Sequence, residues 1–296
     1  MADLSATAGE LQRRLVAGDA TSEDLVKAFL AQIDKHNSNG AKLNAVISTC
    51  PDHIARDTAV RLDRERQQGR VRSLLHGIPI ILKDAIVTSP ELGMRTTAGS
   101  ALFAGMRAVG NAPAAQKLVD AGMIVLAKGN MTEFCGLKSD DTPIGWSACG
   151  GQTRSPYHRA DLREEDQPVP GGSSSGPAVG VAAGFAPVGI GTETAGSNVY
   201  PASVNGLYAL TLTRGAVSTQ GVFKLSGSFD SLGIQARSPA DVAAVAEVLL
   251  GRGDLRTTPE DAWETLSVGV LECTWGTQGV HEGVGVGKWA QPDMVG

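Results

Sequence analysis

The amino-acid sequence predicts an α/β protein in which helices cover a sheet, and three observations support this fold class. Of the 296 residues, 42% are hydrophobic but only 4% are aromatic, so we expect a core of Ala, Val, Ile and Leu, as in helix-covered sheets. The β-branched run GIPIILKDAI, which begins at Gly77, predicts a short buried strand running into a loop. Residues 112–121 predict a helix that Gly122 ends, and residues 123–127 predict the strand behind it, a helix-then-strand unit typical of α/β proteins.

The first segment of the chain predicts helices that pack against the rest. Two helices are expected before residue 40, and Thr21 precedes Asp24 at the spacing of a capping box at the start of the second. Apolar residues then recur at helical spacing, at Leu25, Ala28, Phe29 and Ile33. A short apolar stretch follows at 44–47, and residues 54–68 predict a charged, solvent-facing helix.

The middle of the chain is rich in Gly, Ser and Pro. Residues 130–170 predict a long loop, and its acidic stretch at 161–167 is typical of a solvated surface. Loops of this length in compact domains are functional or disordered as a rule. Beyond it the sequence predicts a helix over 178–184, a strand over 187–191, a tight turn through Ser197 and a further element entered at Pro201.

The last part of the chain changes character. Residues 241–250 predict a regular Ala/Val/Leu helix, but the sequence after Val268 is Gly-rich and poor in large aliphatic residues. We therefore expect one domain over residues 1–268 and a divergent, irregular tail over 269–296. No internal repeat is present in the sequence.

Charge and cysteine content exclude several classes of protein. The formal net charge is −5 and no basic tract is present, which argues against nucleic acid or an anionic membrane as a partner. The N-terminus is polar and the longest weakly polar run, 178–190, is too short to cross a bilayer, so we expect a soluble, cytoplasmic protein. The four cysteines form no C-x-x-C pair and no Cys/His cluster, which predicts reduced thiols (Cys50, Cys135, Cys149 and Cys273).

The two Ser/Gly clusters at 171–176 and 191–197 allow three interpretations. A flexible linker does not run directly into apolar helix and strand segments as these clusters do. A phosphate-binding loop requires Lys after its last Gly, and here Pro177 stands after Gly176. The third interpretation is nucleophilic catalysis by Ser197, whose turn presents consecutive backbone N–H groups that can stabilise an oxyanion.

A serine nucleophile requires a base, because a hydroxyl is a weak nucleophile at its own pKa. The five histidines stand in no recognisable catalytic context, and the G-x-S-x-G motif is absent around Ser197. Lys83 remains as the base, because burial at the end of an apolar strand lowers the pKa of an amine. Asp84 next to it is expected to turn or cap the loop and to have no acid role.

Four motifs stand in one order along the chain: GIPIILKD around Lys83, AGMIVLAKGNMTEF at 121–134, GGSSSG at 171–176 and GTETAGS at 191–197. In these motifs the sequence resembles the amidase signature family of serine hydrolases, over roughly 11–271. The resemblance implies a large, mixed, twisted sheet covered by helices and a Ser–cis-Ser–Lys triad. By motif position the nucleophile is Ser197, the bridging serine is Ser173 and the base is Lys83. The separation of the two serines matches the family, which selects Ser173 over its two serine neighbours.

The resemblance also implies how the remaining groups take part. The backbone N–H groups of Thr194, Ala195, Gly196 and Ser197 would form the oxyanion hole, and the Gly172–Ser173 peptide would be cis. Cys135 stands at a position that lines the substrate pocket in relatives, although a plain buried thiol explains it equally well. No metal and no organic cofactor are implied.

Three features depart from the common family pattern. Glu193 replaces an Asp, Ala195 replaces a Gly that would tolerate a positive φ, and Asn198-Val199 replace Ile-Arg. Family members are also much longer than 296 residues, so the chain is expected to be a C-terminally truncated member.

The function implied is hydrolysis of a small-molecule linear amide to a carboxylate and an amine or ammonia. The resemblance is also compatible with a homo-oligomer. Two alternatives stay open. One is an amidotransferase-like subunit, and the other is a truncated, non-catalytic remnant that only binds ligand.

Overall fold

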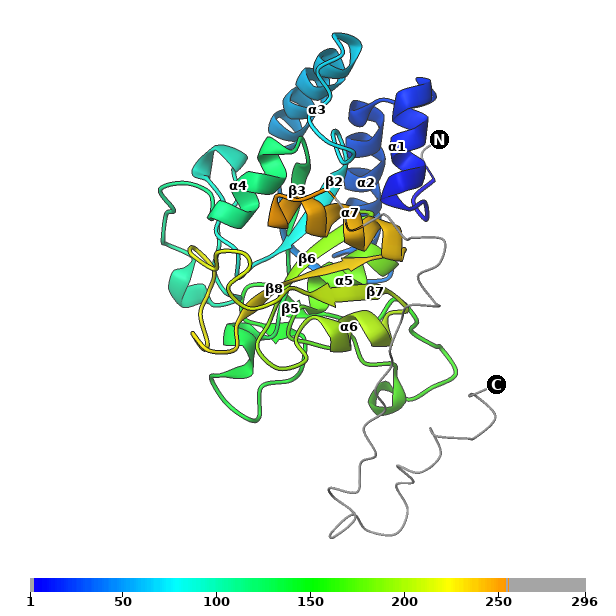
Figure 1. Cartoon of the computed structure of the whole chain (residues 1–296). Helices are drawn as coiled ribbons and strands as arrows, with labels where there is room; N and C mark the ends of the chain where they lie inside the picture. The colour runs from blue at the N-terminus through cyan, green and yellow to red at the C-terminus, as the bar shows by residue number, and fades with distance from the viewer. Residues whose placement is uncertain (1–2, 254, 256–296) are drawn as a thin grey trace, which may run out of the picture. The chain divides into compact units, whose positions relative to one another are not determined.

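A six-stranded mixed sheet forms the centre of the computed structural model, which describes residues 3–253 and 255 (Figure 1). The strands run in the order β1-β3-β2-β6-β8-β7 across the sheet. Their bounds are β1 Val46–Thr49, β2 Pro79–Lys83, β3 Ile124–Gly129, β6 Val188–Glu193, β7 Tyr208–Thr211 and β8 Ser231–Ala236. The predicted α/β fold with a mixed sheet is confirmed.

Strand direction decides which side chains meet at one edge of the sheet. The central strand β2 runs parallel to both neighbours, β3 and β6, whereas β1, β7 and β8 pair antiparallel. Leu82 of β2 lies beside Ile190 of β6. The carboxyl ends of these parallel strands therefore lie together, and this edge is where α/β proteins build their sites.

Seven α-helices surround the sheet in the described part of the chain. Their bounds are α1 Ala8–Ala17, α2 Ser22–His36, α3 Asp52–Gln67, α4 Pro113–Asp120, α5 Ser175–Ala182, α6 Val199–Val204 and α7 Pro239–Leu250. The capping box predicted at Thr21 is present, because its hydroxyl accepts a hydrogen bond from Asp24 N at 3.1 Å and the Asp24 carboxylate accepts one from Thr21 N at 3.0 Å. Asp241 of α7 caps a second helix across the fold, since its carboxylate accepts hydrogen bonds from the N–H groups of Ala8 and Gly9 in α1 at 2.8 and 2.9 Å.

Helix α5 packs close to the sheet because small residues line it. It contacts β1, β2, β3, β6 and β8, and the view in Figure 1 shows it at the centre of the molecule. A Cβ atom added at Gly176 would lie 2.1 Å from Asn130 N and 2.2 Å from Ala45 O, so only glycine fits at this point. The GGSSSG cluster thus runs directly into a buried helix, whose first two residues are Ser175 and Gly176, and this excludes the linker interpretation.

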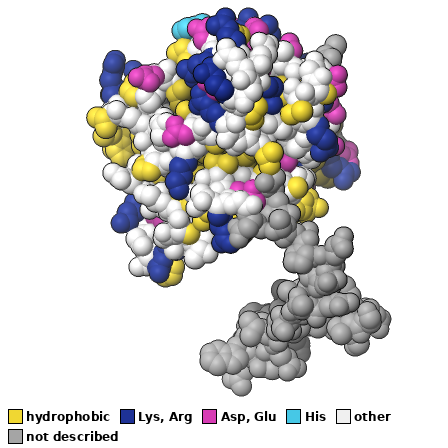
Figure 2. Space-filling model, turned by 45° about the horizontal axis from the view of Figure 1, so that its top comes forward, with side chains coloured by type: hydrophobic (Ala, Val, Ile, Leu, Met, Phe, Trp, Pro, Cys, Tyr) yellow, Lys and Arg dark blue, Asp and Glu magenta, His cyan; other side chains and the backbone are white. Residues whose placement is uncertain are grey.

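The core has the composition that the sequence predicts. It consists mainly of Ala, Val, Ile and Leu, with Phe29 and Phe185 as its fully buried aromatic side chains. None of the described helices is both long and apolar enough to cross a membrane. On the face shown in Figure 2, basic side chains lie at several separate places with acidic ones between them.

The structure contains elements at two places where the sequence patterns predict none. Strands β7 and β8 are one case, and the 130–170 segment contains the other, a two-stranded ribbon of β4 Trp146–Ser147 with β5 Gly151–Gln152. Short 3-10 turns complete this segment and the preceding loop, at Pro90–Leu92, Ala101–Phe103, Glu133–Gly136 and Glu164–Asp166. The predicted tail over 269–296 lies outside the described residues.

Candidate active site

Lys83 is fully buried at the end of β2, and its amine has three polar neighbours. Nζ lies 2.7 Å from Ser173 Oγ, 2.8 Å from Thr192 Oγ1 and 3.5 Å from the Thr192 carbonyl oxygen. The structure therefore brings the predicted base and the predicted bridging serine into direct contact. Thr192, which no sequence pattern singles out, supplies the other two contacts.

Burial lowers the pKa of Lys83, because a desolvated ammonium ion is disfavoured relative to the neutral amine. Cys135, Asp230 and Glu193 act in the opposite direction, but desolvation dominates. A neutral amine has two N–H donors and one lone pair. In the neutral form, Thr192 can accept from both N–H donors, and the lone pair can accept a hydrogen bond from the Ser173 hydroxyl.

Ser173 alone of its cluster reaches the lysine. The Gly172–Ser173 peptide bond is cis, as the family resemblance implies, and the Ser173 side chain is buried. The Ser174 hydroxyl instead donates to the Thr192 carbonyl at 3.1 Å and accepts from Thr192 N at 3.2 Å. The Ser175 hydroxyl donates to the Gly171 carbonyl at 2.6 Å. Ser173 is thus the member of the cluster whose hydroxyl contacts Lys83.

The predicted nucleophile Ser197 lies half-buried in the turn after β6. Its carbonyl oxygen accepts a hydrogen bond from Ser174 N at 3.0 Å, which ties this turn to the serine cluster. Within the described residues no hydrogen bond joins the Ser197 and Ser173 hydroxyls, and catalytic hydrogen bonds of free enzymes commonly tighten only when substrate binds.

The predicted oxyanion donors lie in this turn. Gly196 has a φ of 80°, whereas Ala195 is not among the residues of positive φ, so the Ala found at 195 carries no backbone penalty. Over the described part of the chain, the N–H groups of Ala195, Gly196 and Ser197 have no hydrogen-bond acceptor. Unpaired consecutive N–H groups in a tight turn are suited to bind an anionic oxygen.

Two departures from the family pattern have structural partners. The Glu193 carboxylate accepts hydrogen bonds from Asn198 N at 2.8 Å and Val199 N at 2.9 Å, so backbone donors bind it where the usual Arg is absent. Asn198 is fully buried, and a Cβ atom at Gly233 would lie 2.1 Å from its Cγ. The glycine on β8 therefore makes room for the asparagine.

Asp230 is a further residue of the site that the sequence patterns do not reveal. Its Oδ1 accepts a hydrogen bond from Thr194 Oγ1 at 2.6 Å, and its Oδ2 accepts hydrogen bonds from the N–H groups of Leu225 and Ser226 at 2.8 and 2.9 Å. It joins the 225–230 loop to the turn that carries the predicted nucleophile, Ser197. An acidic residue directly before a strand is the only signal that the sequence offers for it.

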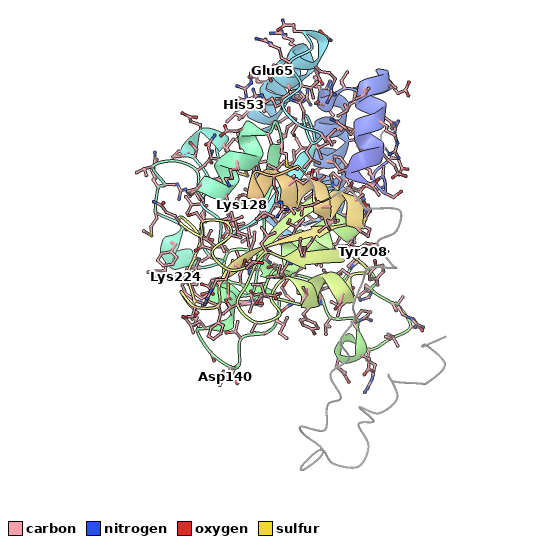
Figure 3. All side chains as sticks on the ribbon, in the orientation of Figure 1. His53, Glu65, Lys128, Asp140, Tyr208 and Lys224 are labelled. Carbon is pink, nitrogen blue, oxygen red and sulfur yellow. The ribbon has the colours of Figure 1, made fainter. Side chains whose placement is uncertain are left out.

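Cys135 lies in a left-handed turn, with a φ of 56°, and is half-buried. Together with Thr192, Thr194 and Asp230 it lines a small pocket, whose wall also includes Lys224, labelled in Figure 3. Its location is compatible with a substrate-pocket role, which stays a prediction.

Two buried charged side chains, Asp84 and Lys128, support the loop after Lys83. Asp84 turns this loop as expected, because its Oδ2 accepts hydrogen bonds from the Thr97 N–H and hydroxyl and from Gly99 N. Lys128, which is labelled near the centre of the molecule in Figure 3, donates to Thr96 Oγ1 at 2.8 Å and to the Ile86 carbonyl. Burial lowers the pKa of Lys128 to about 8.

Asn130 connects the strand layer to the 145–153 ribbon. Its amide nitrogen donates to the carbonyls of Asn44 and Gly151, both at 3.0 Å, and to Thr153 Oγ1 at 2.9 Å. Its oxygen accepts from Met131 N at 2.8 Å and from the Ser147 hydroxyl at 2.6 Å. Asn130, the first residue of the NMTEF stretch, thus holds neighbouring segments of the fold together.

The described residues contain no group of three or more His, Cys, Asp or Glu side chains that could hold a metal ion. Cys50, Cys135 and Cys149 are free thiols, and the predicted thiol Cys273 lies outside the described residues. The groups that the site brings together are hydroxyls, an amine and backbone amides.

Comparisons with known proteins show which family the chain is similar to. The sequence profile of the Amidase family matches residues 24–293. The chain is 38% identical over 241 residues to a subunit of the glutamyl-tRNA(Gln) amidotransferase of Chloroflexus aurantiacus, and this match covers 81% of this chain and 45% of that protein.

Solved structures are similar as well. The native peptide amidase of Stenotrophomonas maltophilia superimposes with a TM-score of 0.76 at 42% identity, over 90% of this chain and 51% of that one. An amidase family protein of Bacillus anthracis gives a TM-score of 0.76 at 35% identity, over 84% of this chain and 47% of that one. The chain thus spans about half the length of these relatives. The family match and the shared fold establish that the chain belongs to the amidase signature family.

Proposed function

We propose that the protein hydrolyses the carbon–nitrogen bond of a small linear amide through an acyl-enzyme on Ser197. The observation that carries this proposal is the 2.7 Å contact between the buried amine of Lys83 and the hydroxyl of Ser173. Because burial lowers the pKa of Lys83, a larger share of the amine is neutral near pH 7 and able to accept a proton.

In the first half of the reaction Lys83 takes the proton of Ser173 as Ser173 takes that of Ser197. The Ser197 oxygen then forms a bond to the amide carbon, and the N–H groups of the turn stabilise the oxyanion, each contributing roughly 3 kcal/mol to the transition state. The proton returns through Ser173 to the leaving nitrogen as the C–N bond breaks. The products at this stage are a free amine or ammonia and an ester on Ser197.

Water completes the cycle by the same route. The relay removes a proton from a water molecule, its oxygen attacks the ester carbon, and the proton goes to Ser197 as the acyl–oxygen bond breaks. A carboxylic acid leaves and the starting enzyme is restored. Water is the only co-reactant in the cycle.

A serine-directed fluorophosphonate probe tests this proposal directly. We expect the purified chain to be labelled, and Ser197→Ala to remove the label. Ser203→Ala on α6 is the matched control, because Ser203 is exposed and its hydroxyl contacts only the Tyr200 carbonyl of its own helix. A folded chain that never labels would overturn the proposal and favour the non-catalytic, ligand-binding alternative.

A second candidate is an amidotransferase-like subunit that releases ammonia for a partner protein. The identity to the Chloroflexus amidotransferase subunit favours it. Substrate type separates the two: a subunit of this kind releases ammonia from a primary amide, whereas a general amidase also cleaves anilides, which release an aromatic amine. Turnover of a p-nitroanilide by the isolated chain would therefore support the amidase.

A further inference from the structure

A pocket of about 470 Å³ lies beside the loop that follows Lys83. Its walls come from residues 85–108 and 221–223, and they are mostly apolar. The larger apolar side chains in these walls are Val87, Met94, Phe103, Met106, Val222 and Phe223. This volume and lining are typical of a pocket for the apolar part of a small ligand.

The pocket borders the candidate active site. Val222 and Phe223 also line the small pocket formed by Cys135, Thr192 and Thr194. Phe223 N donates a hydrogen bond to the carbonyl of Ala85 at 2.8 Å, and Ala85 stands two residues after Lys83. The pocket therefore shares the wall formed by Val222 and Phe223 with the small pocket beside Thr192 and Thr194.

One wall of the pocket contains an unpaired buried hydroxyl. Thr88 is 1% exposed and its Oγ1 has no hydrogen-bond partner. The other two threonines in the wall are engaged, since Thr96 Oγ1 accepts from Lys128 and the Thr97 hydroxyl donates to Asp84. An unsatisfied buried hydroxyl is costly, and a ligand oxygen that accepts its hydrogen bond removes that cost.

The charge of the walls has one sign. Arg95 and Arg107 are the charged residues of the lining, both are exposed, and no Asp or Glu is among the described lining residues. Arg95 also donates to the Ala104 carbonyl, which orients its guanidinium. Lys128 and Asp84 lie behind the wall, and the Asp84 carboxylate accepts hydrogen bonds from the N–H groups of Thr97 and Gly99. Guanidinium groups at the mouth of an apolar pocket favour a carboxylate end group on the ligand.

We propose that this pocket binds the acyl part of the substrate, and that this part is an apolar chain that carries an oxygen along its length and ends in a carboxylate. The inference rests on the proposed function. The acyl part is the portion that stays bound to Ser197 after the amine leaves, so an apolar pocket beside the loop that follows Lys83 suits it. The leaving amine needs a path to solvent instead.

A matched pair of substrates tests the charge preference. The mono-p-nitroanilide of suberic acid and its methyl ester differ only in the end group. We expect the wild type to prefer the acid by roughly tenfold in kcat/KM, the effect of one charge-assisted contact. Arg95→Gln with Arg107→Gln should bring this ratio close to one, while Arg64→Gln, an exposed arginine on α3, should leave the ratio as in the wild type. A ratio near one in the wild type, or an unchanged ratio in the double variant, would overturn the inference.

Binding to Ser197→Ala separates this inference from the proposed function. Calorimetry with the same acid and ester measures the preference without turnover, and circular dichroism confirms that each variant is folded. An arginine-dependent preference in a chain that never hydrolyses amides would support the pocket and refute the amidase.

The unpaired hydroxyl has its own binding test in the same Ser197→Ala background. An acid chain with one mid-chain ketone should bind more tightly than the all-methylene chain, and Thr88→Val should remove this difference. Equal affinities before the substitution would refute the polar contact.

Discussion

The hydroxyl of Thr192 lies 2.8 Å from the amine of Lys83, although the two residues stand 109 positions apart in the chain. Thr192 is itself held by Ser174, which bonds both its N–H and its carbonyl group. We therefore propose that Thr192 is a positioning residue, which orients the neutral amine of Lys83 so that its lone pair faces Ser173.

Thr192→Val should slow fluorophosphonate labelling of Ser197 by about tenfold, because one hydrogen bond that orients the amine is lost. The variant also removes an acceptor that stabilises the ammonium form, so the pKa of Lys83 should fall further. The acid limb of the pH–rate profile should accordingly shift to lower pH. Thr192→Ser keeps the hydroxyl and should restore both the labelling rate and the position of the acid limb on the pH axis. A slower rate with an unmoved limb would indicate a purely structural role.

Labelling should increase with pH until Lys83 is neutral and then level off, because only the neutral amine accepts a proton. Since burial lowers the pKa of Lys83, this plateau should be reached below the usual lysine range. Lys83→Met should reduce the labelling rate at least a hundredfold. Stopped-flow measurement of labelling from pH 6 to 10 checks both statements, and an unaffected rate in Lys83→Met would show that the base is a different group.

The buried Lys128 predicts a pH-dependent stability. In the folded chain it loses its proton at about pH 8, whereas in the unfolded chain it keeps the ordinary value of 10.5. Between these values the unfolded state binds more protons, so the contribution of Lys128 to the free energy of unfolding should increase with pH across this window. Urea titrations at pH 7.5, 9 and 10.5 should show this increase in the wild type.

Lys128→Met should make the increase smaller, because the contribution of Lys128 is lost and that of the buried Lys83 remains, while Lys27→Met, an exposed lysine on α2, should leave the increase as in the wild type. If the free energy of unfolding increased equally with pH in the two variants, the assignment of the effect to Lys128 would be contradicted.

Asn130→Ala should lower the free energy of unfolding by about 3 kcal/mol, because it leaves several buried donors and acceptors without partners. The control is Asn39→Ala, whose side chain makes one exposed hydrogen bond to the Asp34 carbonyl and whose loss should cost less than about 0.5 kcal/mol. Urea unfolding followed by circular dichroism measures both. Equal losses in the two variants would mean that the ribbon contacts of Asn130 contribute little.

Local patterns predict the parts of the fold that depend on neighbouring residues. The Thr21–Asp24 capping box and the buried strand before Lys83 are of this kind, because spacing and periodicity within a few residues carry the signal. Strands β7 and β8 are not predictable in this way, because their residues form a sheet through pairing with strands distant in sequence. The pattern of β7 alternates weakly between exposed and half-buried positions, as befits an edge strand.

The sequence by itself determined which chemical groups are present: a lysine after an apolar strand, serines in glycine-rich turns, and consecutive backbone amides beside one of them. It did not determine which groups touch. Only the tertiary structure decided that Thr192 and Ser173 both contact Lys83, that Asp230 holds the turn that carries Ser197, and that a pocket with two arginines in its lining lies nearby. The physical reason is strand order: β2 and β6 pair in parallel, so segments a hundred residues apart end at the same edge of the sheet.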